Sequence, residues 1–519
     1  MTPQSQPVEH QPISRVLVAN RGEIAVRVIR ACREMNIGTV AVCSQVDQQA
    51  LHAEMADVSV MIGPAEPSES YLRPDRIIEA AKATDCDAIH PGYGFLAENA
   101  NFARACRDAG LIFIGPGPEV IEQMGEKTAA RAIMEKAGVP VVPGAMLPDP
   151  DADGNFPSDE ILSIAESVGY PLMVKAAFGG GGKGMRLVES ADAVLAACSG
   201  ACREALGAFG NGKVYMERFI QRPRHVEFQI FGDSHGNAVH LFERECSIQR
   251  RHQKIIEETP SPALTPELRQ KMGTAAVAAA KAVAYEGAGT VEFLLSQDGG
   301  FYFLEMNTRL QVEHPVTEMV TGTDLVRTQI QVAEGRPLPW TQDDLTSHGH
   351  SIECRIYAED PESGFMPSLG EILLLNEPSG PGIRIDSGIR QGDEVTMYYD
   401  PMIAKLSVHA GSRRNAIDRA IGALKHYAVL GVTTNVEYLI SILQEGAFAD
   451  GDLHTGFLDE EMPDWQSNLG DESDLALAVA AVAEHDRLGR GSAGPSSSTE
   501  NTIATPWSSL GRFRLNGLG

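Results

Sequence analysis

The chain has few basic residues for its length, and this shortage restricts the partners it can have. Its 519 residues include 43 Lys and Arg against 70 Asp and Glu, which gives a formal net charge of −27. Nucleic acids and anionic membrane surfaces are polyanions and are not attracted to a chain of that charge. We therefore expect no nucleic-acid or membrane partner, and a polyanionic ligand would have to be bound by a local cluster of Lys and Arg.

The sequence also lacks the signals of secreted, membrane-spanning and zinc-binding proteins. No stretch approaches the ~18 consecutive apolar residues of a membrane span, and the first 14 residues have neither the basic flank nor the apolar run of a signal peptide. The eight cysteines are scattered without a Cys-x-x-Cys pair, which favours reduced thiols over a disulfide framework or a zinc site. We expect a soluble cytoplasmic protein in which Cys198 and Cys202 are neighbours on a helix.

Two common nucleotide-binding motifs are absent, although a glycine-rich loop is present. The strand-to-helix turn at 19–25 has one glycine where a dinucleotide fingerprint needs three, which excludes NAD or FAD binding there. The loop at 178–185 is not a Walker A loop, because Lys183 is followed by Gly184. Its four consecutive glycines form either a mobile loop or a lid whose backbone N–H groups close over phosphate oxygens. The preceding strand and the two flanking lysines, Lys175 and Lys183, favour the lid.

A hairpin over residues 289–314 carries the strongest chemical signal. Two apolar, β-rich runs at 290–296 and 301–305 flank an Asp-Gly turn, and opposed positions in this hairpin sum to 597. Glu292 and Glu305 are therefore predicted to face each other on one side of the sheet. Because facing carboxylates repel, we expect a cation between them, and oxygen ligands suit Mg²⁺ or Mn²⁺.

The same face is predicted to continue beyond the hairpin. Asn307 shares it, and if the extended path continues, Arg309, Gln311 and Glu313 follow at alternate positions. A metal pair, an amide, a cation and a base would then stand in one row. The alternative is a half-exposed edge strand with solvated charges, but such a face rarely carries Glu, Asn, Arg, Gln and Glu in succession.

A local excess of positive charge occurs between residues 243 and 254. This run holds three arginines, one lysine and one histidine. It is either a solvated basic turn or the local anion site that an acidic chain needs, and we favour the anion site. The apolar strand at 214–220 upstream can hydrogen-bond an adenine edge through its backbone, although many buried strands look the same.

The order of segments predicts a multidomain α/β and α+β chain. Alternating strands and helices indicate a parallel α/β domain at the N-terminus. A helix expected over 124–137 carries Lys127, and a Pro-, Asp- and Gly-rich loop at 143–158 marks the edge of a subdomain. Short strands followed by helices predict a separate C-terminal α+β domain, then a helix, a Gly/Ser/Pro/Thr linker and a tail. The expected domains are 13–123, 124–340 with a lid at about 142–216, 350–462, and the tail 463–519.

Several strings resemble a known family. A lysine on a helix, a Gly-rich lid between strands and a Glu…Glu-x-Asn hairpin resemble ATP-grasp ligases. Four longer strings resemble the biotin carboxylase component of biotin-dependent carboxylases: HPGYGFLAE at 90–98, CSIQRRHQK at 246–254, EMNTRLQVEHPVTE at 305–318 and YYDPMIAKL at 398–406. The resemblance covers about residues 13–462. It implies an N-terminal α/β domain, an ATP-grasp domain with a Gly-rich lid and a C-terminal α+β domain.

The resemblance implies that ATP and bicarbonate carboxylate biotin through carboxyphosphate. Mg²⁺ or Mn²⁺ would be held by Glu292, Glu305 and Asn307. The nucleotide and bicarbonate would be bound by Lys127, Lys175, Gly181, Gly182, Glu217, Arg218, Phe219, Ile220, His225, Gln249, His252, Gln311 and Val312. Lys254 and Arg309 would bind bicarbonate at the reacting centre, and Glu313 would be the general base. Arg355 would stabilise the enolate form of biotin.

The final acceptor of the carboxyl group is left open by two strings that disagree. AAFGGGGKGM at 176–185 is closer to pyruvate carboxylases, whereas EETPSPAL at 257–264 is closer to acyl-CoA carboxylases. We expect the first half-reaction of an acetyl-CoA or propionyl-CoA carboxylase of fatty acid metabolism, with a pyruvate-type carboxylase as the alternative. The biotin-attachment string Ala-Met-Lys-Met is absent, which implies a biotin carrier on another chain. A carboxyltransferase subunit and a homodimer are further expectations from the resemblance.

Two rival functions are weighed against this one. A different ATP-grasp ligase, such as a carbamoyl-phosphate synthase, shares the metal hairpin but would lack the CSIQRRHQK and RLQVEH strings. A non-catalytic ATP-binding subunit would have lost one of four residues, Glu292, Glu305, Arg309 or Glu313. Both strings and all four residues are present, so the sequence favours a catalytic biotin carboxylase.

Overall fold

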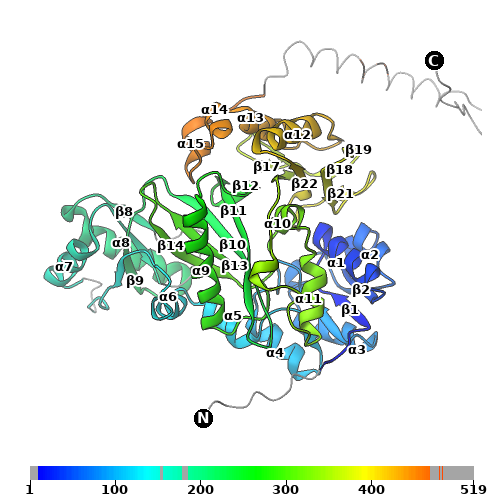
Figure 1. The fold of residues 1–519 in the computed structure, drawn as a ribbon, viewed down its shortest axis with the longest axis horizontal. Helices are drawn as coiled ribbons and strands as arrows, with labels where there is room; N and C mark the ends of the chain where they lie inside the picture. The colour runs from blue at the N-terminus through cyan, green and yellow to red at the C-terminus, as the bar shows by residue number, and fades with distance from the viewer. Residues whose placement is uncertain (1–9, 152–155, 178–184, 468–478, 480–481, 483–519) are drawn as a thin grey trace, which may run out of the picture. The chain divides into compact units, whose positions relative to one another are not determined.

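The computed structural model describes residues 10–151, 156–177, 185–467, 479 and 482 (Figure 1). The chain separates into two units, Met1–Trp465 and Gln466–Gly519. Nearly all of the described structure belongs to the first unit, and in the second Val479 and Val482 are helical and exposed. The predicted linker and the end of the tail lie outside the described residues. In the described part of the chain, no helix is long and apolar enough to cross a membrane.

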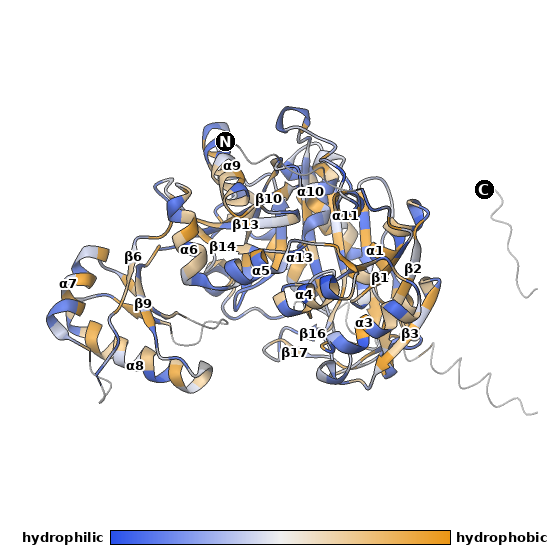
Figure 2. Ribbon diagram, turned by 90° about the horizontal axis from the view of Figure 1, so that it is seen from below, coloured by the Kyte–Doolittle hydropathy of each residue, from blue (hydrophilic) through white to orange (hydrophobic). Residues whose placement is uncertain are grey.

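The N-terminal part is a parallel sheet with helices, which confirms the α/β prediction. Its strands lie in the order β3-β2-β1-β4-β5, and all four pairings are parallel. Figure 2 shows blue and orange residues alternating along α3, whose Ile77, Ala80 and Ala81 are buried. The sequence missed β3, an edge strand with exposed Val58 and Met61. The elements are β1 Arg15–Val18, α1 Gly22–Glu34, β2 Gly38–Ser44, α2 Leu51–Met55, β3 Val58–Gly63, α3 Pro74–Ala83, β4 Ala88–His90, α4 Ala100–Asp108 and β5 Ile112–Phe113.

A four-stranded antiparallel sheet lies in the region expected to form the lid, with strand order β6-β9-β7-β8. Its elements are β6 Gly144–Met146, α7 Ser158–Val168, β7 Leu172–Ala176, β8 Arg186–Val188, α8 Ala191–Phe209 and β9 Val214–Arg218. The Gly-rich run between β7 and β8 includes 178–184, which lies outside the described residues. Cys198 and Cys202 are both in α8, as predicted, and all eight cysteines are free and buried.

The helix expected over 124–137 was wrong at its start, because two helices are present. α5 Pro118–Gly125 ends at Gly125, and α6 spans Lys127–Lys136. Between them Glu126 is extended, with φ −93° and ψ 106°. Lys127 is therefore the first residue of α6, and its side chain lines the cavity described below.

One antiparallel sheet of eight strands runs through the middle and C-terminal parts of the chain, in the order β14-β13-β10-β11-β12-β15-β22-β20. Its strands are β10 Arg224–Gly232, β11 Ala238–Arg250, β12 Gln253–Thr259, β13 Gly287–Leu295, β14 Phe301–Asn307, β15 His350–Tyr357, β20 Ile383–Ser387 and β22 Met402–Ala410. The C-terminal domain was expected to be separate, but β12 pairs with β15 and joins both parts into one sheet. The basic run at 243–254 is mostly strand, because only Arg251 and His252 form its turn.

The β13–β14 hairpin confirms the predicted pairing of Glu292 with Glu305. The register shifts immediately afterwards, so that Phe293 pairs with Phe303 and opposed positions no longer sum to 597. The extended path was expected to reach Glu313, but β14 ends at Asn307 and α10 His314–Thr321 follows. The other helices of this part are α9 Pro266–Ala282, α11 Leu325–Ala333 and the 3-10 turns Gln45–Asp47, Pro67–Glu69 and Gln342–Asp344.

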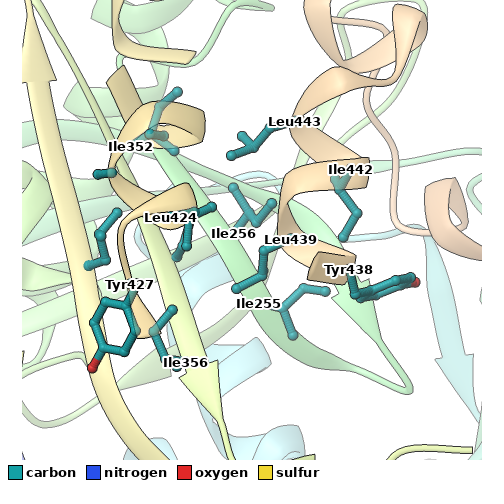
Figure 3. Close-up of a cluster of buried hydrophobic side chains, with 14 of the residues drawn as sticks. Ile255, Ile256, Ile352, Ile356, Leu424, Tyr427, Tyr438, Leu439, Ile442 and Leu443 are labelled. Atoms are coloured by element: carbon teal, nitrogen blue, oxygen red, sulfur yellow. The ribbon is translucent and has the colours of Figure 1, made fainter. Parts of the chain in front are cut away.

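The C-terminal core is built between strands of the large sheet and two helices. Figure 3 shows Leu439, Ile442 and Leu443 of α13 beside Ile255 and Ile256 of β12, and all five side chains are buried. These helices, α12 Arg413–Lys425 and α13 Val436–Gln444, therefore fix the far side of the sheet that carries the site. The remaining elements are β16 Glu359–Asp360, β17 Met366–Pro367, β18 Gly370–Glu371, β19 Leu374–Asn376, β21 Glu394–Val395, β23 Ala428–Leu430, α14 Gly446–Asp450 and α15 Phe457–Glu461.

Candidate active site

A cavity of about 1040 Å³ collects nearly all of the predicted site residues. Its walls come from the start of α1, from α6, from lid strands β7 and β9, and from β11 to β15. The predicted residues that line it are Lys127, Lys175, Glu217, Arg218, Phe219, Ile220, His225, Gln249, His252, Lys254, Glu292, Glu305, Asn307, Arg309, Gln311, Val312 and Arg355. Glu313 is fully buried behind this lining. Gly181 and Gly182 lie outside the described residues.

Lys254 is the centre of the charged network. Its Nζ donates to Glu227 Oε2 at 2.5 Å, to Glu292 Oε1 at 2.8 Å and to Glu313 Oε1 at 2.8 Å. Burial alone would lower the pKa of Lys254, but the three carboxylates outweigh it and raise that pKa well above its usual range. Lys254 therefore stays charged at neutral pH.

Glu227 was missed in the sequence and belongs to the same row as the predicted metal pair. It pairs with Glu292 across β10 and β13, and Glu292 pairs with Glu305 across β13 and β14. On the other side Glu227 pairs with Arg244, whose Nε donates to Glu227 Oε1 at 2.6 Å. The available signal was a lone Glu inside the apolar run of β10, and its register with Glu292 is a long-range property.

Glu292 and Glu305 face each other but differ in environment. Lys254 and His225, whose Nε2 lies 3.0 Å from Glu292 Oε2, outweigh burial and lower the pKa of Glu292. The negative charge of Glu292 is the largest cause that raises the pKa of Glu305, followed by burial. Two apposed carboxylates on a cavity wall offer hard oxygen ligands, and a divalent cation would relieve their repulsion. The donor set therefore fits Mg²⁺ or Mn²⁺.

Asn307 has a different role from the one expected of a free metal ligand. Its Nδ2 donates to Glu292 Oε1 at 2.9 Å, and its Oδ1 accepts from Arg309 Nη2 at 3.1 Å. Both ends of the amide are thus used inside the protein. In this structure Asn307 orients Glu292 and Arg309.

The loop after β14 brings the predicted polar row together without being a strand. Arg309 Nη1 donates to Gln311 Oε1 at 2.7 Å, and Gln311 Nε2 donates to Glu292 Oε1 at 3.3 Å. Two residues that the sequence did not single out hold this loop from outside. Glu98 accepts from Arg309 Nε at 2.9 Å, and Lys405 Nζ donates to the Val312 carbonyl at 2.7 Å.

Glu313 lies between two cations. Its Oε1 accepts from Lys254, and its Oε2 accepts from Arg355 Nη2 at 3.0 Å. Burial would raise the pKa of Glu313, but the charges of Lys254, Arg355 and Arg244 outweigh it and lower the pKa well below its usual range. Glu313 is therefore a carboxylate at neutral pH and can accept a proton.

The lid side of the cavity combines lysines with an apolar wall. Lys175 forms an ion pair with Glu217 across β7 and β9. His225 Nδ1 lies 2.8 Å from Gln249 Nε2, which joins the two residues that the resemblance placed near the ribose. The lining on this side also includes four apolar residues that sequence reasoning missed, Met173, Met185, Leu294 and Leu304. Such a wall suits a flat apolar ring, and the lysines suit phosphates.

Comparisons with known proteins agree along the whole described part of the chain. The family models that match are "Biotin carboxylase, N-terminal domain" at residues 12–121, "Carbamoyl-phosphate synthase L chain, ATP binding domain" at 126–341 and "Biotin carboxylase C-terminal domain" at 353–460. Methylcrotonoyl-CoA carboxylase subunit alpha from Dictyostelium discoideum is 49% identical over 511 residues, which are 98% of this chain and 71% of that protein. The biotin carboxylase of a Nostoc species is 52% identical over 447 residues, 86% of this chain and 98% of that protein.

A solved structure matches in fold as well. It is the biotin carboxylase domain dimer of the Hydrogenobacter thermophilus 2-oxoglutarate carboxylase, in complex with MgADP, ADP and bicarbonate. The two chains are 47% identical with a TM-score of 0.81, and the match covers 88% of this chain and 100% of that one.

Proposed function

The chain belongs to the biotin carboxylase family and is an ATP-dependent carboxylase ligase, and we propose that it joins bicarbonate to biotin in the cavity described above. The observation that carries the assignment of residues is the position of Lys254. This one cation binds Glu292 of the metal pair and Glu313, the proposed base, at the same time. The site for the phosphates and the site for the base are therefore parts of one network.

The lid side would hold the nucleotide. Lys127, Lys175 and His252 would bind the phosphates, and the backbone at 217–220 would bind adenine. Glu292 and Glu305 would hold Mg²⁺, which offsets the negative charge of the phosphates during phosphoryl transfer. The carboxylate pair supports this role because the charge of Glu292 already raises the pKa of Glu305.

The loop side would hold bicarbonate between Lys254, Arg309 and Gln311. Glu313 takes the proton of bicarbonate, and the freed oxygen attacks the γ-phosphorus, which releases ADP and gives carboxyphosphate. Glu313 is held as a weak base by Lys254 and Arg355 before substrate binds. An anion beside these cations shares their charge, which raises the pKa of Glu313 and makes it a stronger base at the moment of reaction.

Arg355 would serve the second half of the reaction. The carboxyl group passes to N1′ of biotin, and the ureido oxygen of biotin carries negative charge as its proton leaves. Arg355 lines the cavity and is fixed by Glu257 and Glu313, so its charge is preorganised for that oxygen.

The final acceptor is proposed to be an acyl-CoA. The match to the methylcrotonoyl-CoA carboxylase subunit extends over 98% of this chain, which supports an acyl-CoA over a 2-oxo acid. A biotin carrier, a carboxyltransferase and a homodimer are proposed partners, and the dimeric Hydrogenobacter domain supports the last of these. The boundaries at 13–123, 124–340, 350–462 and 463–519 and a cytoplasmic location stay predictions.

The function is tested with the purified chain and free biotin. ATP cleavage should require both bicarbonate and Mg²⁺, free biotin should stimulate it, and radiolabelled bicarbonate should appear in carboxybiotin. Transfer to acetyl-CoA, propionyl-CoA, methylcrotonoyl-CoA or pyruvate should need added carrier and carboxyltransferase. ATP cleavage that ignores bicarbonate would contradict the proposal.

A further inference from the structure

A pair of buried carboxyl groups lies behind Arg355, outside every role assigned above. Glu257 of β12 and Glu353 of β15 are register partners in adjacent antiparallel strands, so their side chains leave the sheet on the same face. Both residues are fully buried. A buried carboxyl pair needs a cation, a metal or a proton to be tolerated.

Each carboxyl group has one occupied oxygen and one unoccupied oxygen. Glu257 Oε1 accepts from Arg355 Nε at 2.6 Å, and Glu353 Oε2 accepts from Ser407 Oγ at 2.6 Å. The other two oxygens, Glu257 Oε2 and Glu353 Oε1, have no hydrogen-bond partner among the described residues. A single proton on one carboxyl group would let it donate to the other, which would satisfy both oxygens at once.

The surrounding charges do not neutralise two carboxylates. The cations are Arg355, whose other nitrogen donates to Glu313, and Lys405 of β22, which is shared with Glu23 at 3.3 Å and Asp386 at 4.0 Å. The other titratable groups that face the pair are Lys254 on β12, Cys246 on β11, Cys354 and Tyr357 on β15, and Glu313 before α10.

Titration of the pair falls close to neutral pH. Burial, partly offset by Arg355, raises the pKa of Glu257 to about 7. Burial, partly offset by Lys405 and reinforced by Glu257, raises the pKa of Glu353 to about 8. Because both are raised, a proton is kept by the pair below this range and lost above it.

We propose that Glu257 and Glu353 share one proton and together position Arg355, so that the pair sets how much positive charge Arg355 presents to the cavity. With the proton in place the pair has one negative charge, and Arg355 keeps charge for Glu313 and for an anionic oxygen in the cavity. Without the proton the pair has two negative charges beside the Arg355 guanidinium. Arg355 is then drawn to Glu257, and the step that needs its charge slows.

This inference rests on the proposed function, in which Arg355 serves the transfer of the carboxyl group to biotin. It predicts an alkaline decline in kcat for carboxylation of free biotin, approaching tenfold per pH unit above the pKa of the pair if one ionisation controls the step. Bicarbonate-dependent ATP cleavage without biotin should decline less, because that step relies on Glu313 and Lys254. Neither Glu257 nor Glu353 lines the cavity, so the KM for ATP should not follow this profile.

The test is the pH profile of Glu353→Gln from about pH 6 to about pH 9. Gln has the shape of Glu, and its amide donates permanently to Glu257, which fixes the pair in the state of one negative charge. The alkaline limb of the free-biotin profile should move upward by at least about one pH unit. Glu257→Gln fixes the same net charge from the other side and gives a second test if the first variant folds poorly.

Glu245→Gln is the matched control. Glu245 is also buried on this sheet and has a pKa raised by burial, but it is bound by Ser247 and by Ser261, away from Arg355. Its profile should superimpose on that of the wild type. A Glu353→Gln enzyme that keeps the wild-type alkaline limb overturns the inference. A wild-type enzyme that carboxylates no free biotin at any pH overturns the proposed function instead.

Discussion

Replacing Glu313 by Gln removes one negative charge from the centre of the network and keeps the shape of the side chain. Glu313 is fully buried and accepts from Lys254 at 2.8 Å and from Arg355 at 3.0 Å. A hydrogen bond to a charged group contributes about 1.5–3 kcal/mol. Lys254 and Arg355 keep other carboxylate partners, so neither becomes an unpaired buried charge. We expect the free energy of unfolding to fall by about 2–3 kcal/mol.

The effect of Glu313→Gln on catalysis should be larger than its effect on stability. General base catalysis contributes about 10²–10⁴-fold, so bicarbonate-dependent ATP cleavage should fall by at least about 10²-fold. Glu313 does not line the cavity, so the Kd for ATP, measured by calorimetry, should change by less than about twofold. The assay compares this Kd with kcat for bicarbonate-dependent ATP cleavage in the same preparation.

Glu258→Gln separates the loss of a base from the loss of a buried charge. Glu258 is also buried between two cationic side chains, since it accepts from Arg413 Nε at 2.7 Å and lies 2.6 Å from His350 Nε2. It is remote from the cavity lining. This control should lose comparable stability and keep its turnover. Wild-type turnover in Glu313→Gln, or an equal loss in both variants, would refute the assignment of Glu313 as the base.

Three further predictions concern the metal pair, the bicarbonate loop and the core. Glu305→Gln should raise the Mg²⁺ concentration needed for half-maximal ATP cleavage and lower all ATP-dependent activities together; an unchanged Mg²⁺ titration would exclude Glu305 as a ligand. Arg309→Ala should lower kcat for biotin carboxylation by about 10²-fold with little change in the Kd for ATP, and a change confined to ATP binding would place Arg309 with the nucleotide. Leu439→Ala should destabilise the C-terminal core by about 2–5 kcal/mol in denaturant unfolding, because Leu439 is fully buried in the cluster of Figure 3; a loss below about 1 kcal/mol would show that the core collapses around the vacated space.

Local pairing explains which parts of the fold the sequence predicts. The Glu292–Glu305 pair lies in one hairpin, where a short turn and alternating side chains determine the register. The pairing of β12 with β15 joins segments about a hundred residues apart, such as Glu257 and Glu353, and no local pattern reports it. The C-terminal strands therefore seemed to form a separate domain when they continue the same sheet.

The same limit applies to the site. Residues within one motif, such as Arg309, Gln311 and Glu313, were identified together even though the strand expected to carry them ends at Asn307. Their geometry comes from side-chain hydrogen bonds and from distant anchors. Glu98 and Lys405 are such anchors, and each meets the loop only after the N-terminal and C-terminal parts have packed against it.

The central claim is that bicarbonate itself attacks the γ-phosphate after Glu313 removes its proton. It is tested by supplying bicarbonate labelled with ¹⁸O to the purified chain with ATP, Mg²⁺ and free biotin. Mass spectrometry then follows the label in the inorganic phosphate released. The account predicts that one labelled oxygen passes from bicarbonate to each phosphate formed during carboxylation, and that Glu313→Gln loses this transfer. Phosphate that carries oxygen only from water would contradict it.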